Sequence, residues 1–376
     1  MIERILKSKI LQKLNTGKAI VLIGPRQVGK TTLINSVLEN KEHLFLDGDD
    51  PTVRNLLTNP NTEQLKSIIG NYKIVFIDEA QRIENIGITL KIITDQFKEV
   101  QLLVSGSSAF ELNNQTNEPL TGRKWEYKLF PISWEELENN IGYIKSEQQV
   151  ELRILHGMYP EVINNQGDEI EVLKELTNSY LYKDILAYSG IRKPQLLEKL
   201  LRALALQTGS EVSYNELAQL IGVDKNTVSN YIDVLEKGYI VFRLPSFSRN
   251  LRNEIKTNQK IFFYDTGVRN MIIGNFNLLD SRNDKGALWE NFLISERIKK
   301  INYDNTLANS YFWRTKQQQE IDYVEEISGV LTGYEFKWNP KSKVKIPKSF
   351  GEAYNSKVDI INRNNFREFI KSNQNL

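Results

Sequence analysis

The sequence of 376 residues contains no cysteine and only two histidines, His43 and His156. The absence of cysteine excludes disulfides, thiolate zinc sites and cysteine nucleophiles, and it fits a reducing compartment. Two histidines cannot build a histidine-rich metal site. His43 lies beside an apolar segment and His156 near the end of a helical pattern, so we expect structural roles for both.

The sequence also lacks long apolar runs and a dominant charge. Nowhere do about 18 apolar residues occur together, and residues 1–18 carry Lys and Arg without the apolar core of a signal peptide. The 49 basic and 47 acidic residues leave a net charge of +2, so any nucleic-acid contact must come from local patches. We expect about two or three domains, no membrane contact and a cytoplasmic protein.

Residues 24–32 read Gly-Pro-Arg-Gln-Val-Gly-Lys-Thr-Thr and match the pattern G-x-x-x-x-G-K-[ST]. An apolar segment precedes them and a helical pattern follows, which favours a phosphate-binding loop over an ordinary strand-to-helix turn. Gly24 and Gly29 let the backbone curl so that its N–H groups point at phosphates, Lys30 reaches the β and γ phosphates, and Thr31 ligates Mg²⁺. The nucleotide-binding residues we expect are Gly24, Pro25, Arg26, Gln27, Val28, Gly29, Lys30, Thr31 and Thr32.

Five apolar, β-branched segments alternate with helical patterns in the N-terminal half. Short buried strands separated by helices predict an α/β fold with a parallel sheet covered on both faces. The segments are 19–23, 43–46, 74–77, 102–104 and 125–129.

The third segment ends in Asp78 and Glu79, two carboxylates at the carboxyl end of a predicted strand. Ligands bind at this edge of open α/β sheets. We expect Asp78 to hold Mg²⁺ through water, and Glu79 to orient and deprotonate the attacking water.

Two further features of this half carry open alternatives. Ser105 or Ser107, after the fourth strand, either holds the nucleophilic water or only forms a turn. Arg123 either stabilises the transferring phosphoryl group, in its own chain or from a neighbouring subunit, or makes one surface ion pair.

These motifs together resemble the AAA+-type ATPases of bacteria and archaea that carry a C-terminal domain of unknown function. The resemblance covers nearly the entire chain and implies ATP rather than GTP as the nucleotide. It matches Asp78 and Glu79 to the second nucleotide motif, residues 105–108 to the sensor strand, and Arg123 to the Gly-Arg of the family. Because no clear second sensor arginine is present, the oligomeric state stays open. The motifs are residues 24–32, 76–82, 105–108, 120–123 and 129–136.

The middle of the chain predicts a winged helix. Residues 169–208 have helical periodicity typical of packing helices. Ser213 and Glu216 form a capping-box pattern before a helix over 214–221, and a second helix over 225–237 leads into a wing that starts at 239–244. Residues 213–260 either contact DNA or serve as a lid or protein contact. The cations of the wing region are Arg243, Arg249, Arg252, Lys256 and Lys260.

The C-terminal third places Asp322 thirteen residues before Glu335-Phe-Lys337. This spacing resembles the PD-(D/E)xK nuclease fold, in which the two carboxylates would share Mg²⁺ beside the lysine, with Glu290 contributing from a helix that starts at Gly286. A strand face with ordinary ion pairs is the alternative. Residues 337–348 add a positive strip that suits DNA, formed by Lys341, Lys343, Lys345 and Lys348.

We therefore expect three domains, over 1–165, 166–275 and 276–376. The first hypothesis is an enzyme that hydrolyses ATP with Mg²⁺ and couples this to a DNA-contacting module. The rivals are a nucleotide-gated switch that binds DNA or protein partners without cleavage, and an ATP-regulated, metal-dependent nuclease.

Overall fold

The computed structural model describes residues 2–106, 119–178, 193–248 and 259–372. Contacts within the chain divide it into two units, Met1–Ile132 and Ser133–Leu376, which we describe separately. The three domain boundaries that we expect from the sequence stay predictions. In the part of the chain that the structure describes, every helix is too short or too polar to span a membrane.

The first unit contains a five-stranded parallel sheet in the order β2-β3-β4-β1-β5. This confirms the predicted strands and their direction. The central strands β1 and β4 are buried along their whole length, whereas the outer strands β2 and β5 are partly exposed. The strands are β1 (Ala19–Ile23), β2 (Leu44–Asp47), β3 (Ile74–Asp78), β4 (Gln101–Gly106) and β5 (Lys124–Lys128).

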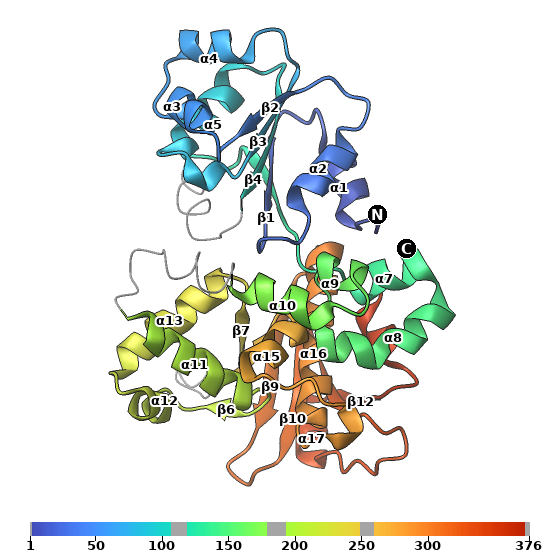
Figure 1. The fold of residues 1–376 in the computed structure, drawn as a ribbon. Helices are drawn as coiled ribbons and strands as arrows, with labels where there is room; N and C mark the ends of the chain where they lie inside the picture. Colours follow the sequence, from blue (N-terminus) through green and yellow to red (C-terminus); the bar gives the residue numbers. More distant parts are fainter. Residues whose placement is uncertain (1, 107–118, 179–192, 249–258, 373–376) are drawn as a thin grey trace. The chain divides into compact units, whose positions relative to one another are not determined.

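Helices cover both faces of this sheet (Figure 1). Val21, Val75 and Val104 belong to one buried cluster with Leu57 and Leu90, which come from helices on one face. Helices α1 and α2 lie on the other side of β1 (Figure 1). The helices are α1 (Leu6–Lys13), α2 (Lys30–Val37), α3 (Pro51–Leu57), α4 (Thr62–Ile69), the 3-10 helix η1 (Ala80–Arg82) and α5 (Ile86–Gln96).

The second unit begins with helices and continues into a winged-helix arrangement. The sequence predicts its two central helices with the observed bounds, α12 (Tyr214–Ile221) and α13 (Lys225–Lys237). Ser213 accepts the N–H of Glu216 at the start of α12, and Asp224 accepts two N–H groups at the start of α13. Gly222 ends α12 with φ of +75°, a left-handed conformation that suits glycine.

Strands β6 (Glu211–Val212), β8 (Gln259–Phe263) and β7 (Val241–Pro245) form a three-stranded antiparallel sheet next to these helices, with β8 in the centre. The preceding helices are α7 (Trp134–Ile141), α8 (Tyr143–His156), α9 (Pro160–Asn164), α10 (Glu169–Thr177) and α11 (Pro194–Leu206).

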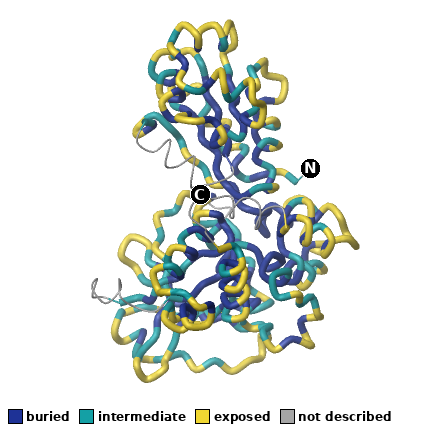
Figure 2. Tube along the Cα trace, turned by 60° about the vertical axis from the view of Figure 1, so that its left-hand side comes forward, coloured by how far each residue is buried: buried dark blue, intermediate teal, exposed yellow. Residues whose placement is uncertain are grey.

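A four-stranded sheet in the order β12-β11-β10-β9 completes the second unit. β9, β10 and β11 are antiparallel, and β12 runs parallel to β11. Figure 2 shows buried segments running through the interior of each unit. The elements are α15 (Thr266–Ile273), η3 (Leu279–Ser281), α16 (Lys285–Asp304), β9 (Ala308–Arg314), β10 (Glu320–Ile327), β11 (Val330–Phe336), α17 (Lys348–Tyr354), β12 (Lys357–Ile361) and α18 (Phe366–Ile370).

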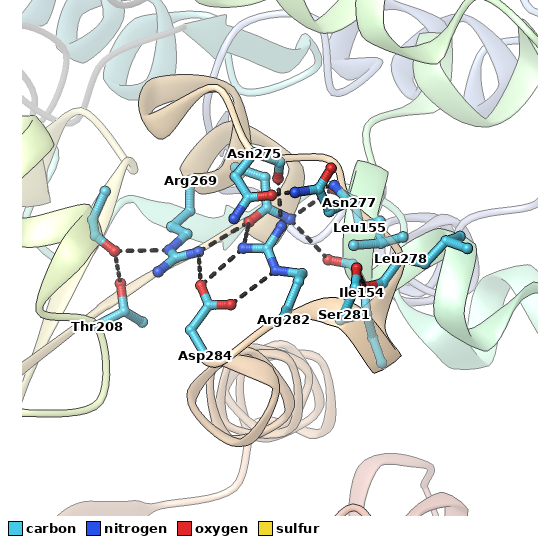
Figure 3. A network of polar contacts seen from close by, with 12 residues as sticks. Ile154, Leu155, Thr208, Arg269, Asn275, Asn277, Leu278, Ser281, Arg282 and Asp284 are labelled. Carbon is cyan, nitrogen blue, oxygen red and sulfur yellow. Dashed lines mark hydrogen bonds and ion pairs between the residues drawn. The ribbon is translucent and has the colours of Figure 1, made fainter.

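Two buried arginines share one carboxylate where α15 approaches the start of α16 (Figure 3). Arg269 donates to Asp284 at 2.6 Å and to the carbonyl of Ala205 at 2.8 Å. Arg282 binds both oxygens of Asp284 at 2.8 Å. Burial alone would raise the pKa of Asp284, but hydrogen bonds from Arg282 and Arg269 lower it to about 2. The network therefore ties α11, α15 and α16 together.

Replacing Asp284 by Asn should destabilise the protein, because two buried guanidinium groups lose their counter-charge. The lowered pKa means that ionised Asp284 stabilises the fold by about 2 kcal/mol at neutral pH, and that this contribution is lost as the pH falls from about 4 towards 2. Urea unfolding should show a lower midpoint for Asp284→Asn at neutral pH and a shrinking difference in acid.

The control for this measurement is Asp280→Asn, because Asp280 is 90% exposed in its ion pair with Lys285. That variant should unfold like the wild type. Equal midpoints for Asp284→Asn and the wild type at neutral pH would contradict the role assigned to the network.

Candidate functional site

The predicted phosphate-binding loop lies between β1 and α2, at the carboxyl end of β1. Gly24 packs closely against Leu129, the residue that follows β5, and any Cβ at Gly24 would overlap the carbonyl oxygen of Leu129. Gly29 has φ of +89° and is the residue before α2, a left-handed conformation that glycine adopts without strain. Both glycines of the motif are thus required by the backbone geometry of the loop.

Lys30 is folded over this loop and is only 5% exposed. Its ammonium group donates to the carbonyl oxygens of Gly24 at 3.1 Å and Pro25 at 2.8 Å. A positive charge is therefore held against the cradle in which the sequence places the phosphates.

Asp78, at the end of β3, is oriented by three donors. The hydroxyl of Thr31 donates to Oδ2 at 2.6 Å, the N–H of Glu79 donates to Oδ1 at 3.0 Å, and the hydroxyl of Ser105 donates to Oδ1 as well. Thr31 and Asp78 offer hard oxygen atoms side by side, which are the ligands that Mg²⁺ prefers. Ser105 is fully buried in β4, and the structure shows it as a positioning group for Asp78; Ser107 lies outside the described residues.

Glu79 adopts a left-handed backbone conformation, with φ of +45°, which is uncommon for a residue other than glycine. Its carboxylate accepts a hydrogen bond of 2.5 Å from the side-chain amide of Gln81. Gly48 lies so close that a Cβ there would come within 2.5 Å of the carbonyl oxygen of Glu79. Strained backbone of this kind is concentrated at functional sites.

A cleft of about 470 Å³ opens beside these groups. Parallel sheets bind ligands at the carboxyl ends of their strands, where this cleft lies. Arg82, from η1, forms an ion pair with Asp49 at 2.6 Å on the cleft wall. The lining residues are Arg26, Gln27, Gly29, Lys30, Thr31, Thr32, Asp47, Asp49, Asp78, Glu79 and Arg82.

Arg4 is a residue of this site that sequence reasoning missed. Its buried guanidinium donates to the carbonyl of Val28 at 2.7 Å and to that of Phe130 at 2.6 Å. It therefore braces the phosphate-binding loop against the segment that follows β5. No local pattern could have indicated this, because Arg4 and Phe130 are 126 positions apart.

Arg123 lies at the amino ends of the strands, opposite to the end of the sheet where the cleft opens. It immediately precedes β5, and its carbonyl accepts the N–H of Ala19 at the start of β1, whereas the phosphate-binding loop follows the end of β1. Its guanidinium pairs with Asp95 at 2.6 Å. Within its own chain, Arg123 therefore makes a surface ion pair and does not reach the phosphate-binding loop. A role for Arg123 in stabilising the phosphoryl group of a neighbouring subunit stays a prediction.

In the second unit, the four residues predicted for the nuclease-like site converge. Lys337 lies 3.1 Å from Glu335 and 3.8 Å from Asp322, and Asp322 accepts the N–H of Phe336 at 2.8 Å. Glu290 reaches the same region from α16. Burial raises the pKa of Glu290 to about 8, and burial together with the charge of Asp322 raises the pKa of Glu335 to about 7.

Lys260 also belongs to this cluster, contrary to its expected place on an exposed basic wing. It is 2% exposed and pairs with Glu290 and Glu320. Arg243 is paired as well, with Asp233 at 2.5 Å and with Glu236. The remaining cations of that expected wing, Arg249, Arg252 and Lys256, lie outside the described residues.

Three families match successive segments of the chain. Residues 16–138 match a family described as an AAA domain. Residues 147–279 match a domain of unknown function, DUF8612, and residues 285–374 match another, DUF4143. The chain therefore carries a P-loop AAA domain followed by two domains whose descriptions give no activity.

Similar proteins occur in bacteria and archaea. An uncharacterised protein of Mycobacterium tuberculosis is 28% identical over 335 residues, which cover 88% of this chain and 72% of the relative. An uncharacterised protein of Methanocaldococcus jannaschii is 23% identical over 344 residues, which cover 85% and 75%. A solved Walker-type ATPase of Pyrococcus abyssi is similar in fold, with a TM-score of 0.50 and 17% identity over 72% of this chain and 96% of that chain.

Replacing Arg4 by Met should weaken nucleotide binding without touching a cleft residue. Two buried carbonyls lose their donor, so we expect a loss of about 2 kcal/mol in stability and a roughly tenfold higher Kd for ATP. Calorimetric titration and urea unfolding measure both. Lys9→Met, in helix α1 shortly after Arg4, is the control and should leave both values unchanged. An unaltered Kd in Arg4→Met would contradict the bracing role.

Proposed function

We propose that this protein hydrolyses ATP with Mg²⁺ and uses the cycle to change how its second unit contacts DNA. The observation that carries the hydrolytic part is the joint placement of Thr31, Asp78 and Glu79 at one cleft, beside the Lys30 ammonium. The fold and the AAA family match support the same activity.

The residues that would bind and hydrolyse the nucleotide then have distinct roles. Loop amides and Lys30 bind the phosphates, and Thr31 with Asp78 would hold Mg²⁺, whose charge would offset the negative charge of the phosphoryl oxygens. Ser105 fixes the orientation of Asp78. Glu79, held by Gln81, accepts the proton of the attacking water.

The variant Glu79→Gln tests this assignment. It keeps the shape of the side chain and removes its basicity, so kcat for ATP should fall by roughly 100-fold or more while the Kd for ATP stays the same. Glu84→Gln, an exposed residue a few positions away, is the matched control and should retain full activity. Undiminished turnover in Glu79→Gln would exclude Glu79 as the base.

DNA contact by the second unit is supported by two exposed surfaces. The start of α13 presents Lys225 and Asn226, exposed side chains that can bind phosphates and base edges. Residues 341–348 carry the exposed lysines Lys341, Lys343, Lys345 and Lys348. Lysines on one surface segment suit a phosphate backbone.

Replacing Lys343 and Lys345 together by Ala should raise the Kd for duplex DNA by roughly tenfold. The slope of log Kd against log salt concentration should also fall by about two, because two phosphate contacts are lost. Fluorescence anisotropy at several salt concentrations measures both. The control, Lys145→Ala with Lys174→Ala, removes two exposed lysines of other helices. An equal loss of DNA affinity in both double variants would indicate only a general effect of net charge and would contradict a binding surface at residues 341–348.

A nucleotide-gated switch is the second candidate. It is favoured by the small number of cations on the described face of α13, since a surface with few charges suits a protein partner as well as DNA. The two hypotheses differ for Glu79→Gln, because a switch needs ATP occupancy and keeps its cellular function without turnover.

A metal-dependent nuclease is the third candidate. The convergence of Asp322, Glu335 and Lys337 favours it. It predicts that Asp322→Ala or Lys337→Ala abolishes DNA cleavage and leaves ATP hydrolysis intact.

A further inference from the structure

The acidic cluster of the second unit contains a buried cation from another sheet. Lys260 lies in β8, the central strand of the winged-helix sheet, where it pairs in register with Glu211 and Leu244. Its ammonium lies 3.0 Å from Oε1 of Glu290 on α16 and 2.6 Å from Oε1 of Glu320 on β10. One lysine thus joins three elements that are far apart in the sequence.

We propose that Lys260 is the resident cation of the nuclease-like centre, occupying the space between Glu290 and Glu320 and excluding a divalent metal. In this arrangement the centre is closed and does not cleave DNA, and its carboxylates fasten β8 to the C-terminal domain. This inference is independent of ATP hydrolysis and opposes the nuclease candidate.

The other carboxyl groups of the centre also have partners within the protein. Lys337 pairs with Glu335, and one oxygen of Asp322 accepts the N–H of Phe336 while lying 3.8 Å from the Lys337 ammonium. Within the described ranges, no three carboxylate or imidazole side chains are grouped so as to hold a metal ion. A divalent ion between Glu290 and Glu320 would meet the Lys260 ammonium, which lies 3.0 and 2.6 Å from their oxygens, and would be repelled by it.

Lys260 is enclosed by the elements around it and is only 2% exposed. The ring of Phe312 lies 5.4 Å from its ammonium. The side-chain amide of Asn291, next to Glu290, accepts the N–H of Phe263 at 2.9 Å and donates to its carbonyl at 2.7 Å, which fixes β8 against α16. The Lys260 ammonium is thus held on a strand that is itself fixed against the helix carrying Glu290.

The charge balance explains why removal of Lys260 should create a metal site. The cluster holds five carboxyl groups against three cations, and Arg314 is already shared between Glu211 at 2.6 Å and Glu320 at 3.7 Å. Without the Lys260 ammonium, Glu290 and Glu320 would face each other with no cation between them. The carboxylates are Glu211, Glu290, Glu320, Asp322 and Glu335, and the cations are Lys260, Arg314 and Lys337.

The test is a titration of the full-length protein with Mn²⁺ by electron paramagnetic resonance, in an Asp78→Asn background that removes the metal ligand of the ATP site. With Lys260 intact we expect no saturable binding up to about 1 mM. Lys260→Met keeps most of the unbranched side chain and removes the ammonium. It should bind one Mn²⁺ with a Kd of about 0.1 mM or below, at least about tenfold tighter than the limit set for the protein with Lys260 intact. Adding Glu290→Gln to Lys260→Met should abolish that binding.

Three results would overturn the proposal. One is a folded Lys260→Met that gains no Mn²⁺. The second is saturable Mn²⁺ binding with Lys260 intact that Asp322→Asn removes. The third is Mg²⁺-dependent DNA scission by the unaltered protein that Asp322→Asn abolishes. If circular dichroism shows that Lys260→Met does not fold, the two measurements on the protein with Lys260 intact decide. The absence of both saturable Mn²⁺ binding and DNA scission supports a closed centre. Either activity, if Asp322→Asn removes it, refutes a closed centre.

Discussion

A charged side chain that leaves water needs a counter-charge or a full set of hydrogen bonds, and this requirement shapes both candidate sites. In the first unit, the buried Arg4 and Lys30 satisfy it by donating to backbone carbonyls, and in doing so they hold the phosphate-binding loop in place. In the second unit, Lys260 satisfies it with carboxylates from α16 and β10. Function at either site therefore depends on which partners neutralise the buried charges.

The parts of the fold that the sequence predicts well are those with local signals. The bounds of α12 and α13 follow from Ser213, Gly222 and Asp224, because a cap or a left-handed turn is set by residues within a few positions. Strand β1 and the phosphate-binding loop follow from an apolar run and two glycines. The motif residues and the carboxylates at the nucleotide cleft were predictable for the same reason, since the motif and the end of β3 are each contiguous. Asp47 and Asp49, which also line the cleft, belong to no motif and were missed.

Long-range partners were not predictable in this way. Lys260 is close in sequence to other cations, and the sequence alone suggested an exposed basic wing. Its strand is instead covered by α16 on the side that Glu290 approaches, and an alternation pattern cannot reveal which carboxylate a buried lysine will meet. The contacts of Arg4 and Asp284 were unpredictable for the same reason, because their partners come from other segments of the chain.

The two acidic sites differ in the charge of their partners. The donors to Asp78 are two hydroxyl groups and one backbone amide, which orient the carboxylate without cancelling its charge. The partners of Glu290 and Glu335 are ammonium groups, whose positive charge already offsets any negative charge on the carboxyl groups they orient. A carboxylate held by neutral donors still attracts a divalent cation, whereas one held by an ammonium must first lose that partner. Similar acidic motifs can thus give an open metal site in one domain and a closed ion-pair network in another.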